Sequence, residues 1–464
     1  MPREVRRIGP VVREVRIRDT LSGELQLLQA GPGGAVGIYA CGPTTYGPIH
    51  IGNARPFVIF SLLRRFLAHE GYAPNLVINL TDVNDKIYDA ARERGVSSSR
   101  HAEEMIAAYT ADTDRLGLGR PDHEPKATET IEGIIALITD LVDGGHAYES
   151  GGDVYFRVRG YPGYGSLSNR DPDEMDQGEE AGALELKEDS LDFALWKARK
   201  DGEDTSWPSP WGEGRPGWHI ECSAMAEELL GLEFAIHGGG ADLVFPHHEN
   251  EAAQTEAARG RPLARLWMHN GMVETGPDEK MAKSVGNIFL LGEALDAYGR
   301  EAVVDFLISG HYRQPLQFSA RALEQAASRN ERIRDFFRSA DSPDGAADEF
   351  VTQRREDFLV ALADDFNTPR AMAAVYELIA EGHRRPLAGA HQVLTELLGI
   401  VGLASLAAVA GEGGDPEAEA LLAERERARA ERDYLRADAI RDQLGDLGWE
   451  VRDGAEGARL VRIR

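Results

Sequence analysis

Cysteine is nearly absent from this sequence, since only Cys41 and Cys222 occur among its 464 residues. Two cysteines in such a length exclude a disulfide framework. No closely spaced cysteine pair is present either, which excludes the knuckle on which many structural zinc sites are built. No apolar run is long enough to span a bilayer, and residues 1–18 are basic without the apolar stretch of a secretory signal. We therefore expect a cytoplasmic protein with no membrane partner.

Lysine is also scarce, because only seven of the 51 basic residues are lysines. The formal net charge of −27 argues at first sight against a nucleic-acid partner. Charge has to be judged locally, however, and residues 421–464 carry ten arginines against ten acidic residues. Two of the seven lysines fall within one short segment, KMAKS at 280–284. Their scarcity elsewhere makes this pair a stronger signal than it would be in a lysine-rich chain.

The N-terminal part of the chain has the pattern of a doubly wound α/β domain. Apolar runs at 35–42 and 75–82 predict buried strands, and the spacing of apolar residues in 54–71 predicts a helix between them. Runs at 233–239 and 266–272 predict later strands of the same sheet. In such sheets ligands bind at the carboxyl ends of the strands. The predicted fold class is therefore a Rossmann-type parallel sheet with helices.

The length suggests about three domains. The pattern predicts a catalytic domain over 1–318, a helical domain over 319–409 and a small α+β unit over 416–464. An insertion at about 115–217 contains a predicted amphipathic helix over 126–143 and then a stretch expected to be irregular. Further elements are predicted as helices at 320–339, 350–364, 368–383 and 389–404, one long helix over 416–444, and a hairpin that turns between Gly454 and Gly457.

Each cysteine lies in a dense polar motif, and a third such motif follows them. Cys41 is part of YACGPTTYGPIHIGN, Cys222 ends GRPGWHIEC, and FPHHENE supplies further polar side chains. In a helix that starts at the proline of FPHHENE, His247 and Glu251 share a face as i and i+4, whereas His248 points elsewhere. Two thiolates, an imidazole and a carboxylate are enough to bind one zinc ion. The alternative is that both cysteines are inert thiols filling core space.

Two other segments suit a nucleoside triphosphate. HIGN places His50 and Asn53 at the predicted N-terminus of the first helix, where backbone N–H groups favour phosphate. KMAKS offers Lys280 and Lys283 on a loop predicted over 276–290, and ammonium groups can neutralise a pentavalent phosphate. Each segment alone is weak, because a solvated histidine or lysine pair is commoner. Their order along the chain, HIGN after the first strand and KMAKS after the later strands, is the stronger signal.

Together these motifs resemble those of one family, the cysteinyl-tRNA synthetases. The resemblance rests on CGPTTYGPIHIGNARPFV, NLTDVNDKI, GRPGWHIECSAMA, FPHHENEAAQ, KMAKSVGN and DDFNTPRAM, which occur in order along most of the chain. It implies a class I synthetase that uses ATP with Mg²⁺ to convert L-cysteine to cysteinyl-adenylate, and then transfers cysteine to the 3′ end of tRNA(Cys). It further implies one zinc ion per chain, which distinguishes cysteine from serine, and a monomeric enzyme.

The resemblance also implies roles for the residues that match the family's motifs. The implied zinc ligands are Cys41, Cys222, His247 and Glu251. The implied ATP-binding residues are His50, Asn53, Lys280, Lys283, Gly239 and Asp242, and the first four of these are also the implied catalytic residues. The implied amino-acid pocket contains Gly42, Thr81 and Trp218.

Three positions depart from the commoner family pattern. Asn53 stands where the first signature often ends in histidine, Ala282 where the second often has serine, and Asn84 where aspartate is common. Asn53 keeps a hydrogen-bond donor at its position, so we expect activity to survive. The hydroxyl lost at Ala282 predicts a less firmly anchored loop.

Two other functions remain open at the level of the sequence. A ligase that joins cysteine to an amino sugar in mycothiol synthesis resembles the same catalytic domain, but DDFNTPRAM and the last unit favour the tRNA enzyme. An inactive paralogue that binds RNA or metal is disfavoured because both lysines and all four implied ligands are retained. The last unit resembles an anticodon-binding unit, in which Trp449 either stacks on a base or packs against its own helix.

Overall fold

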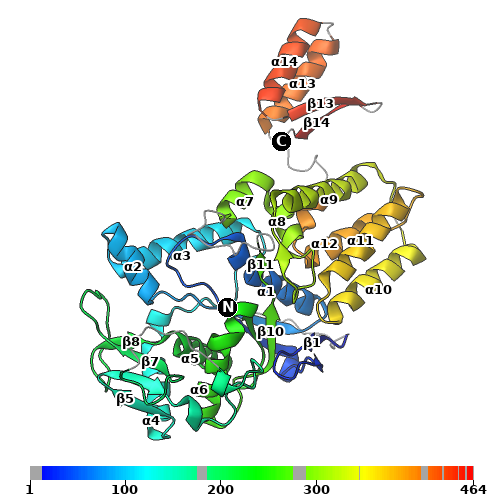
Figure 1. Cartoon of the computed structure of the whole chain (residues 1–464). Coiled ribbons are helices and arrows are strands. Elements are labelled where there is room, and N and C mark those ends of the chain that lie inside the picture. Colours follow the sequence, from blue (N-terminus) through cyan, green and yellow to red (C-terminus); the bar gives the residue numbers. More distant parts are fainter. Residues whose placement is uncertain are drawn as a thin grey trace, which may run out of the picture.

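The computed structural model describes residues 13–174, 185–274, 289–343, 345–408, 416–430, 433–447, 449–454 and 457–462. Figure 1 shows a body of sheet and helices from which a small C-terminal unit stands apart. Within the described residues, no helix is both long and apolar enough to cross a lipid bilayer.

A four-stranded parallel sheet forms the centre of the body, in the order β10–β9–β3–β4. These strands are β3 (Ala35–Ala40), β4 (Ala73–Ile78), β9 (Phe234–Gly240) and β10 (Ala264–Asn270), which confirms the four predicted strands. Strands β9 and β10 are buried along nearly all of their length, and β3 and β4 are buried in their carboxyl halves, as expected for a parallel sheet covered on both faces. The chain adds β4 on one side of β3 and β9 on the other. The strand order therefore reverses beside β3, where ligands bind in sheets of this type.

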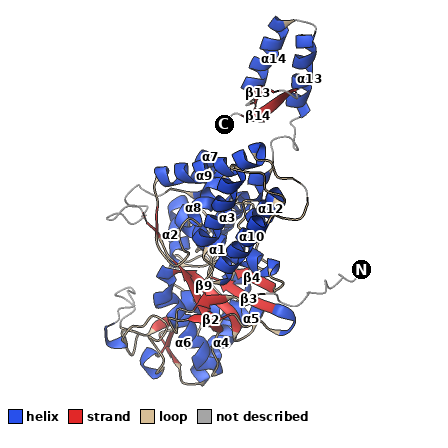
Figure 2. Ribbon diagram, turned by 90° about the vertical axis from the view of Figure 1, so that its right-hand side faces the viewer, coloured by secondary structure: helices blue, strands red, loops and turns tan. Residues whose placement is uncertain are grey.

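Helix α1 (Ile51–His69) connects β3 to β4 and confirms the helix predicted between them. It begins at Ile51 rather than at residue 54, because His50 caps its N-terminus. Helix α5 (Trp218–Leu230) contacts β3 as well. Figure 2 shows α1 on one side of the sheet and α5 on the other. The Rossmann-type fold class is thus confirmed.

Between β4 and β9 the chain forms helices and a second sheet. The helices are α2 (Asp85–Arg94), α3 (Ser98–Arg115) and α4 (Ile131–Asp143), and a short 3-10 helix, η2 (Ala127–Glu129), precedes α4. The antiparallel sheet consists of β5 (Ala147–Ser150), β6 (Asp153–Phe156), β7 (Phe193–Ala198) and β8 (Gly214–Pro216).

The expectation of an irregular course after residue 150 was therefore wrong. Its strands have only three to six residues, which is too short for alternation of apolar and polar side chains to stand out. Their core includes Trp196 and the stacked rings of Phe156 and Phe193, whose centroids lie 5.0 Å apart. Only pairing with the neighbouring strands makes these segments recognisable as a sheet.

Helices follow one another after the last strand of the central sheet. They are α7 (Leu291–Tyr298), α8 (Arg300–Leu307), α9 (Ala320–Ser339), α10 (Glu349–Ala363), α11 (Thr368–Gly382) and α12 (Ala390–Ile400), followed by η9 (Ala404–Ala407). The four helices predicted in this part are confirmed. A single apolar core runs from the central sheet into these helices, and Phe66 of α1 contacts Phe366.

The C-terminal unit has its own small core of Ala418, Ile440, Leu444 and Val451. Two helices, α13 (Pro416–Ala430) and α14 (Tyr434–Asp446), replace the single long helix predicted. The break arises because Asp433 caps a new helix, with its side chain accepting a hydrogen bond from Arg436 N. The predicted hairpin is confirmed as β13 (Trp449–Gly454) and β14 (Gly457–Arg462). Trp449 packs against the unit's core.

Asp365 in the DDFNTPRAM motif joins the helical part to the N-terminal strand β1 (Arg16–Arg18), which pairs with β2 (Leu25–Leu27). Its carboxylate accepts hydrogen bonds from Arg18 N at 2.9 Å, from the Tyr312 hydroxyl at 2.8 Å and from Arg313 Nε at 2.8 Å. It is 6% exposed, so the carboxylate ties three segments together away from bulk water.

We expect Asp365→Ala to lower the free energy of unfolding by about 2–4 kcal/mol, because buried donors lose their acceptor. Asp364→Ala is the matched control. Its side chain is 53% exposed and lies 3.7 Å from Arg370, so we expect a change within about 0.5 kcal/mol. Urea denaturation followed by circular dichroism measures both, and equal losses would contradict the role given to Asp365.

Candidate active site

Four side chains that lie far apart in the sequence converge beside the carboxyl end of β3. Cys41 follows β3, Cys222 belongs to α5, His247 lies in the wide turn η7 (Val244–His248), and Glu251 lies in α6 (Glu249–Arg259). The two Sγ atoms are 3.8 Å apart, Cys41 Sγ is 3.5 Å from Glu251 Oε1, and His247 Nε2 is 3.0 Å from the same oxygen. One potential ligand atom from each lies within 4.8 Å of the others. The structure therefore brings together the four zinc ligands implied by the sequence.

The protonation chemistry of this cluster suits a divalent cation. Burial raises the pKa of the Cys41 thiol well above its usual value, and hydrogen bonding and charge from Cys222 raise it further. Burial also lowers the pKa of His247 well below its usual value, so its imidazole is neutral and can act as a ligand. A bound dication reverses the preference of the thiols and stabilises the thiolate. Two thiolates, an imidazole and a carboxylate form a donor set that fits zinc.

The expectation that His248 points away from this cluster was wrong. Its Nε2 lies 3.2 Å from Cys41 Sγ and 3.8 Å from Glu251 Oε1. The helical spacing argument fails because α6 begins only at Glu249, and Phe245 in the preceding turn is extended (φ −136°, ψ 133°). Consequently Cys41, His237, His248 and Glu251 form a second group whose ligand atoms also lie within 4.8 Å of one another.

Three further buried histidines surround the cluster, and sequence reasoning missed them. His237 Nε2 lies 3.2 Å from Glu251 Oε2, and His219 Nδ1 lies 3.0 Å from His247 Nδ1. His269 Nε2 lies 2.7 Å from His248 Nδ1. His269 lies near the carboxyl end of β10, so its strand position could have pointed to it, whereas His237 lies at the middle of β9. Contacts of this kind fix the orientation and tautomer of ligand imidazoles.

The HIGN motif lies at the N-terminus of α1. His50 Nδ1 accepts hydrogen bonds from Gly52 N at 3.1 Å and Asn53 N at 3.3 Å, so the ring proton is on Nε2, which can donate to an anion. Asn53 Oδ1 accepts a hydrogen bond from His50 N at 3.3 Å and completes a capping box. Asparagine at this position thus maintains the helix start, which explains how the departure from histidine is accommodated. Backbone N–H groups at a helix N-terminus favour phosphate.

Lys280 and Lys283 lie outside the described residues, but the chain on both sides of their segment is placed. At one end, β11 (Val273–Glu274) pairs with β12 (Leu316–Gln317). At the other end, Phe289 O accepts a hydrogen bond from Ile51 N at 3.1 Å. Residue 289 therefore lies directly beside the HIGN turn.

The residues implied for the amino-acid pocket lie around the cysteine–histidine cluster. Trp218 stacks on His247 with ring centroids 4.2 Å apart. Gly42 follows Cys41 and donates a backbone hydrogen bond to Asn79 Oδ1 at 2.9 Å. Asn79 Nδ2 in turn donates to Thr81 Oγ1 at 3.3 Å. These three implied pocket residues are thus linked to the cluster by direct contact or through a neighbouring residue.

Gly239 and Asp242, the other residues implied for ATP, lie at the end of β9. A Cβ on Gly239 would come within 2.9 Å of Leu243 and 3.2 Å of His248, so the strand approaches the cluster closely there. Asp242 lies in the exposed 3-10 turn η6 (Ala241–Leu243) that follows the strand.

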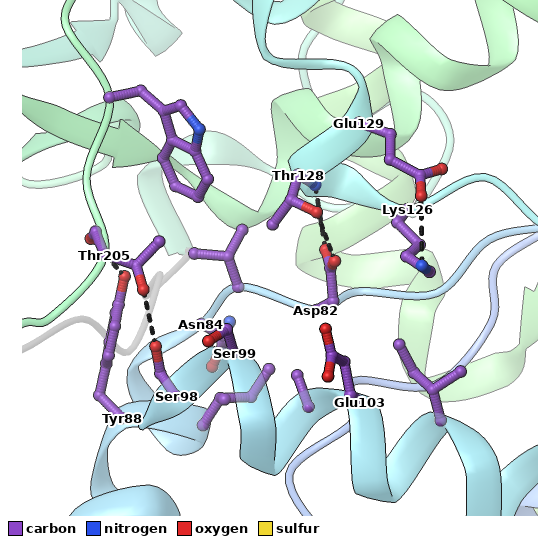
Figure 3. A pocket seen from close by; sticks show the side chains of 15 residues that line it. Asp82, Asn84, Tyr88, Ser98, Ser99, Glu103, Lys126, Thr128, Glu129 and Thr205 are labelled. Carbon is purple, nitrogen blue, oxygen red and sulfur yellow. Dashed lines mark hydrogen bonds and ion pairs between the residues drawn. The ribbon is translucent and has the colours of Figure 1, made fainter. Parts of the chain in front are cut away.

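A separate cavity of about 350 Å³ lies beyond Thr81, between the NLTDVNDKI segment, α3 and η2. Figure 3 shows Asp82 pointing toward Thr128, whose backbone N–H donates to Asp82 Oδ1 at 3.0 Å. Asn84 caps α2 by accepting a hydrogen bond from Lys86 N, which explains why asparagine serves in place of aspartate. The charged lining residues are Asp82, Glu103, Glu129 and Lys126, and Lys126 is 3.2 Å from Glu129. This net negative lining does not suit a triphosphate.

Comparisons with known proteins agree with this geometry. A family model described as the class I (C) tRNA synthetase catalytic domain matches residues 28–328, a DALR domain matches 357–405, and a cysteinyl-tRNA ligase anticodon binding domain matches 412–459. The cysteine–tRNA ligase of Caldicellulosiruptor saccharolyticus is 43% identical over 93% of this chain and 96% of its own. The chain belongs to the cysteine–tRNA ligase family. The enzyme from Halorhodospira halophila is 44% identical over 97% of this chain and 100% of its own.

Solved structures support the fold at much lower identity. Mycobacterium tuberculosis methionyl-tRNA synthetase in complex with methionyl-adenylate has a TM-score of 0.60 at 15% identity, covering 79% of this chain and 90% of that one. An Agrobacterium radiobacter LeuRS in a ternary complex has a TM-score of 0.59 at 11% identity, covering 81% of this chain and 86% of that one. As a cysteine–tRNA ligase, this chain activates its amino acid with ATP and charges tRNA. The match to an anticodon binding domain favours this activity over joining cysteine to an amino sugar.

We expect Gly42→Ala to lower cysteine-dependent ATP–pyrophosphate exchange at least about tenfold, because a near-attack geometry is sensitive to small shifts. A Cβ at this position would lie 1.8 Å from Asn79 O, so the backbone beside Cys41 has to move. Gly399→Ala in α12 is the control, since a Cβ there meets nothing within 4 Å. If the Gly42→Ala enzyme kept full exchange activity, the assignment of Gly42 to the amino-acid pocket would be contradicted.

Proposed function

We propose that Cys41, Cys222, His247 and Glu251 hold one zinc ion at which the side chain of L-cysteine is recognised. The convergence of two thiols, an imidazole and a carboxylate within 4.8 Å at the carboxyl end of β3 carries this proposal. Steric pockets discriminate poorly between near-isosteres such as cysteine and serine. A zinc ion bound there would take the substrate thiol as thiolate, a soft ligand that the serine hydroxyl cannot match at neutral pH.

We prefer His247 as the histidine ligand because neighbouring side chains fix the orientation of its ring. Its Nδ1 faces His219 Nδ1 at 3.0 Å, while its Nε2 faces Glu251 at 3.0 Å. Trp218 covers the ring and keeps water from it. His248 likewise contacts His269 through its other nitrogen, but the group of ligand atoms that contains His248 lacks Cys222, so we assign His248 to orienting the cluster.

For the activation step, we assign His50 and Asn53 to the ATP phosphates. The Nε2–H of His50 and the backbone N–H groups at the start of α1 are donors suited to developing negative charge. Lys280 and Lys283 would neutralise the same phosphates, with Mg²⁺ as counter-ion to ATP, and Gly239 and Asp242 would contact the nucleotide beside β9. Residue 289 beside the HIGN turn supports this convergence.

For the transfer step, we assign tRNA(Cys) binding to the helical domain over 319–409 and to the unit over 416–464, with 1–318 as the catalytic domain. The C-terminal unit has its own core and stands apart from the body, as expected for a module that reaches a distant part of the RNA (Figure 1). Because Trp449 packs against this core, we assign it a structural part rather than base stacking. A monomeric, cytoplasmic enzyme stays a prediction, and sedimentation would test its monomeric state.

We expect Cys222→Ser to lose bound zinc and cysteine-dependent pyrophosphate exchange together, because a hydroxyl is a poor zinc ligand at neutral pH. Metal analysis and exchange assays with cysteine and serine are the measurements. His248→Asn is the matched control, since we place His248 outside the ligand set and expect it to keep one zinc per chain.

Two results would contradict the zinc assignment. One is a Cys222→Ser enzyme that loses zinc but still activates cysteine. The other is a His248→Asn enzyme that loses zinc while His247→Asn retains it, which would favour the second group of ligand atoms.

We expect deletion of 416–464 to weaken tRNA(Cys) binding at least about tenfold, because phosphate and base contacts are removed together. Cysteine-dependent exchange should be unchanged, since the four proposed zinc ligands lie outside the deleted unit. Filter binding at two salt concentrations measures the affinity. Unchanged tRNA affinity at both concentrations would show that this unit does not bind the RNA.

A further inference from the structure

Arg55 is a buried cation in the second turn of α1, two residues after Asn53. Its side chain is 0% exposed, and no acidic side chain among the described residues forms an ion pair with it. Burial lowers its pKa to about 10, so it still carries its charge at neutral pH. A buried charge without a counter-ion is costly, and such a group persists where its hydrogen bonds compensate.

Four backbone carbonyls from two segments surround the guanidinium. Arg55 Nη1 donates to Gly271 O at 2.5 Å, Met272 O at 3.2 Å and Gln314 O at 2.8 Å, and Nη2 donates to His311 O at 3.2 Å. A planar fork with several fixed donors can reach carbonyls on both segments, which a lysine ammonium cannot do equally well.

These two segments lead directly into the strand pair β11–β12. Gly271 and Met272 precede β11, and Gln314 precedes β12. The backbones are already in contact here, because a Cβ on Gly271 would lie 2.3 Å from the carbonyl carbon of Gln314. Leu316 N also donates to Met272 O at 2.8 Å. Arg55 therefore connects helix α1 to the point from which the chain leaves for KMAKS.

The far end of the same segment is held by α1 as well. Ile51 N donates to Phe289 O at 3.1 Å, and Leu291 N donates to Ile49 O at 3.0 Å. The HIGN turn thus holds the exit from the KMAKS segment by backbone pairing, whereas at the entrance α1 hydrogen-bonds the backbone through the side chain of Arg55. The entrance is also paired by its backbone with the chain around β12, but among the described residues the side-chain hydrogen bonds from α1 to it come from Arg55.

We propose that Arg55 is a positioning residue for phosphate chemistry, which fixes the start of the segment bearing Lys280 and Lys283 relative to the helix bearing His50 and Asn53. This inference rests on the proposed roles of the two signatures. In this proposal Arg55 contacts no substrate, and it acts through the backbone carbonyls of Gly271 and Met272. Its removal leaves the proposed zinc ligands in place, because they lie on β3, α5, η7 and α6.

The test compares Arg55→Met and Arg55→Lys with Arg65→Met in the full-length protein. Arg65 is a matched control on the same helix, since it also donates to backbone carbonyls, those of Leu118, Gly399 and Gly117, at 3.3, 3.1 and 3.2 Å. We expect Arg55→Met to lower kcat of cysteine-dependent ATP–pyrophosphate exchange at least about tenfold. Zinc content and KM for cysteine should stay within about twofold of the wild type, while Arg65→Met changes only the unfolding midpoint.

A folded Arg55→Met enzyme with wild-type kcat would overturn the proposal, and so would an equal loss of kcat in Arg65→Met. Should Arg55→Met not fold, Arg55→Lys decides by the same criterion. Failure of the underlying function is distinguishable, because His50→Ala and Lys283→Ala are measured alongside. If neither of those variants lowers the exchange rate, the proposed roles of the two signatures are wrong, and the positioning role of Arg55 is wrong with them. If both variants lower the exchange rate and Arg55→Met does not, only the positioning role of Arg55 is wrong.

Discussion

The pairing of β3 with β9 is the contact on which the site depends. Tyr39 is in register with His237 and Ala40 with Gly238, and Cys41 N donates to Gly238 O at 2.9 Å. This parallel pair is the point at which the order of the sheet reverses. It places the residue after β3 beside the elements that follow β9, so that Cys41 meets His247 and Glu251 although some 200 residues separate them in the chain.

A site built in this way is buried, and burial decides its chemistry. The imidazoles of His247 and His248 are neutral because burial lowers their pKa values, and the Cys41 thiol resists ionisation for the same reason. Neutral imidazoles suit metal ligation directly, whereas the thiols need a cation to become thiolates. The same enclosure would make a substrate thiolate depend on the metal, which is how selectivity for sulfur over oxygen can arise without a second, editing site.

The HIGN turn connects the proposed metal centre to the proposed nucleotide side of the site. It begins nine residues after Cys41, caps α1, and pairs with residue 289 beyond the second signature. Arg55 adds a contact from the next turn of the same helix to Gly271 and Met272. One helix therefore contacts both ends of the segment that carries the two lysines proposed for the phosphates, while β3 and the elements beside it hold the proposed metal ligands.

Much of this arrangement could be predicted from the sequence, and the failures share a cause. The parallel strands, α1 and α9 to α12 were recognisable because each is long enough for its apolar pattern to be distinctive. The antiparallel sheet of β5 to β8 was missed because its strands are short and stabilised by pairing, which is non-local. His237, His219 and His269 were missed because none belongs to a spaced ligand motif. His248 was misplaced because a wide turn, rather than a regular helix, precedes Glu251.

The sequence by itself determined the fold class and the family, because these depend on local patterns and on motifs that occur in order along the chain. The tertiary structure alone decided which histidines reach the thiols and how Asn53 replaces histidine by capping α1. It also decided which backbone carbonyls the Arg55 guanidinium binds. The reason is physical: ligand distances and buried hydrogen bonds depend on the register of β3 against β9 and on the exact start of α6, and neither is encoded by any one segment.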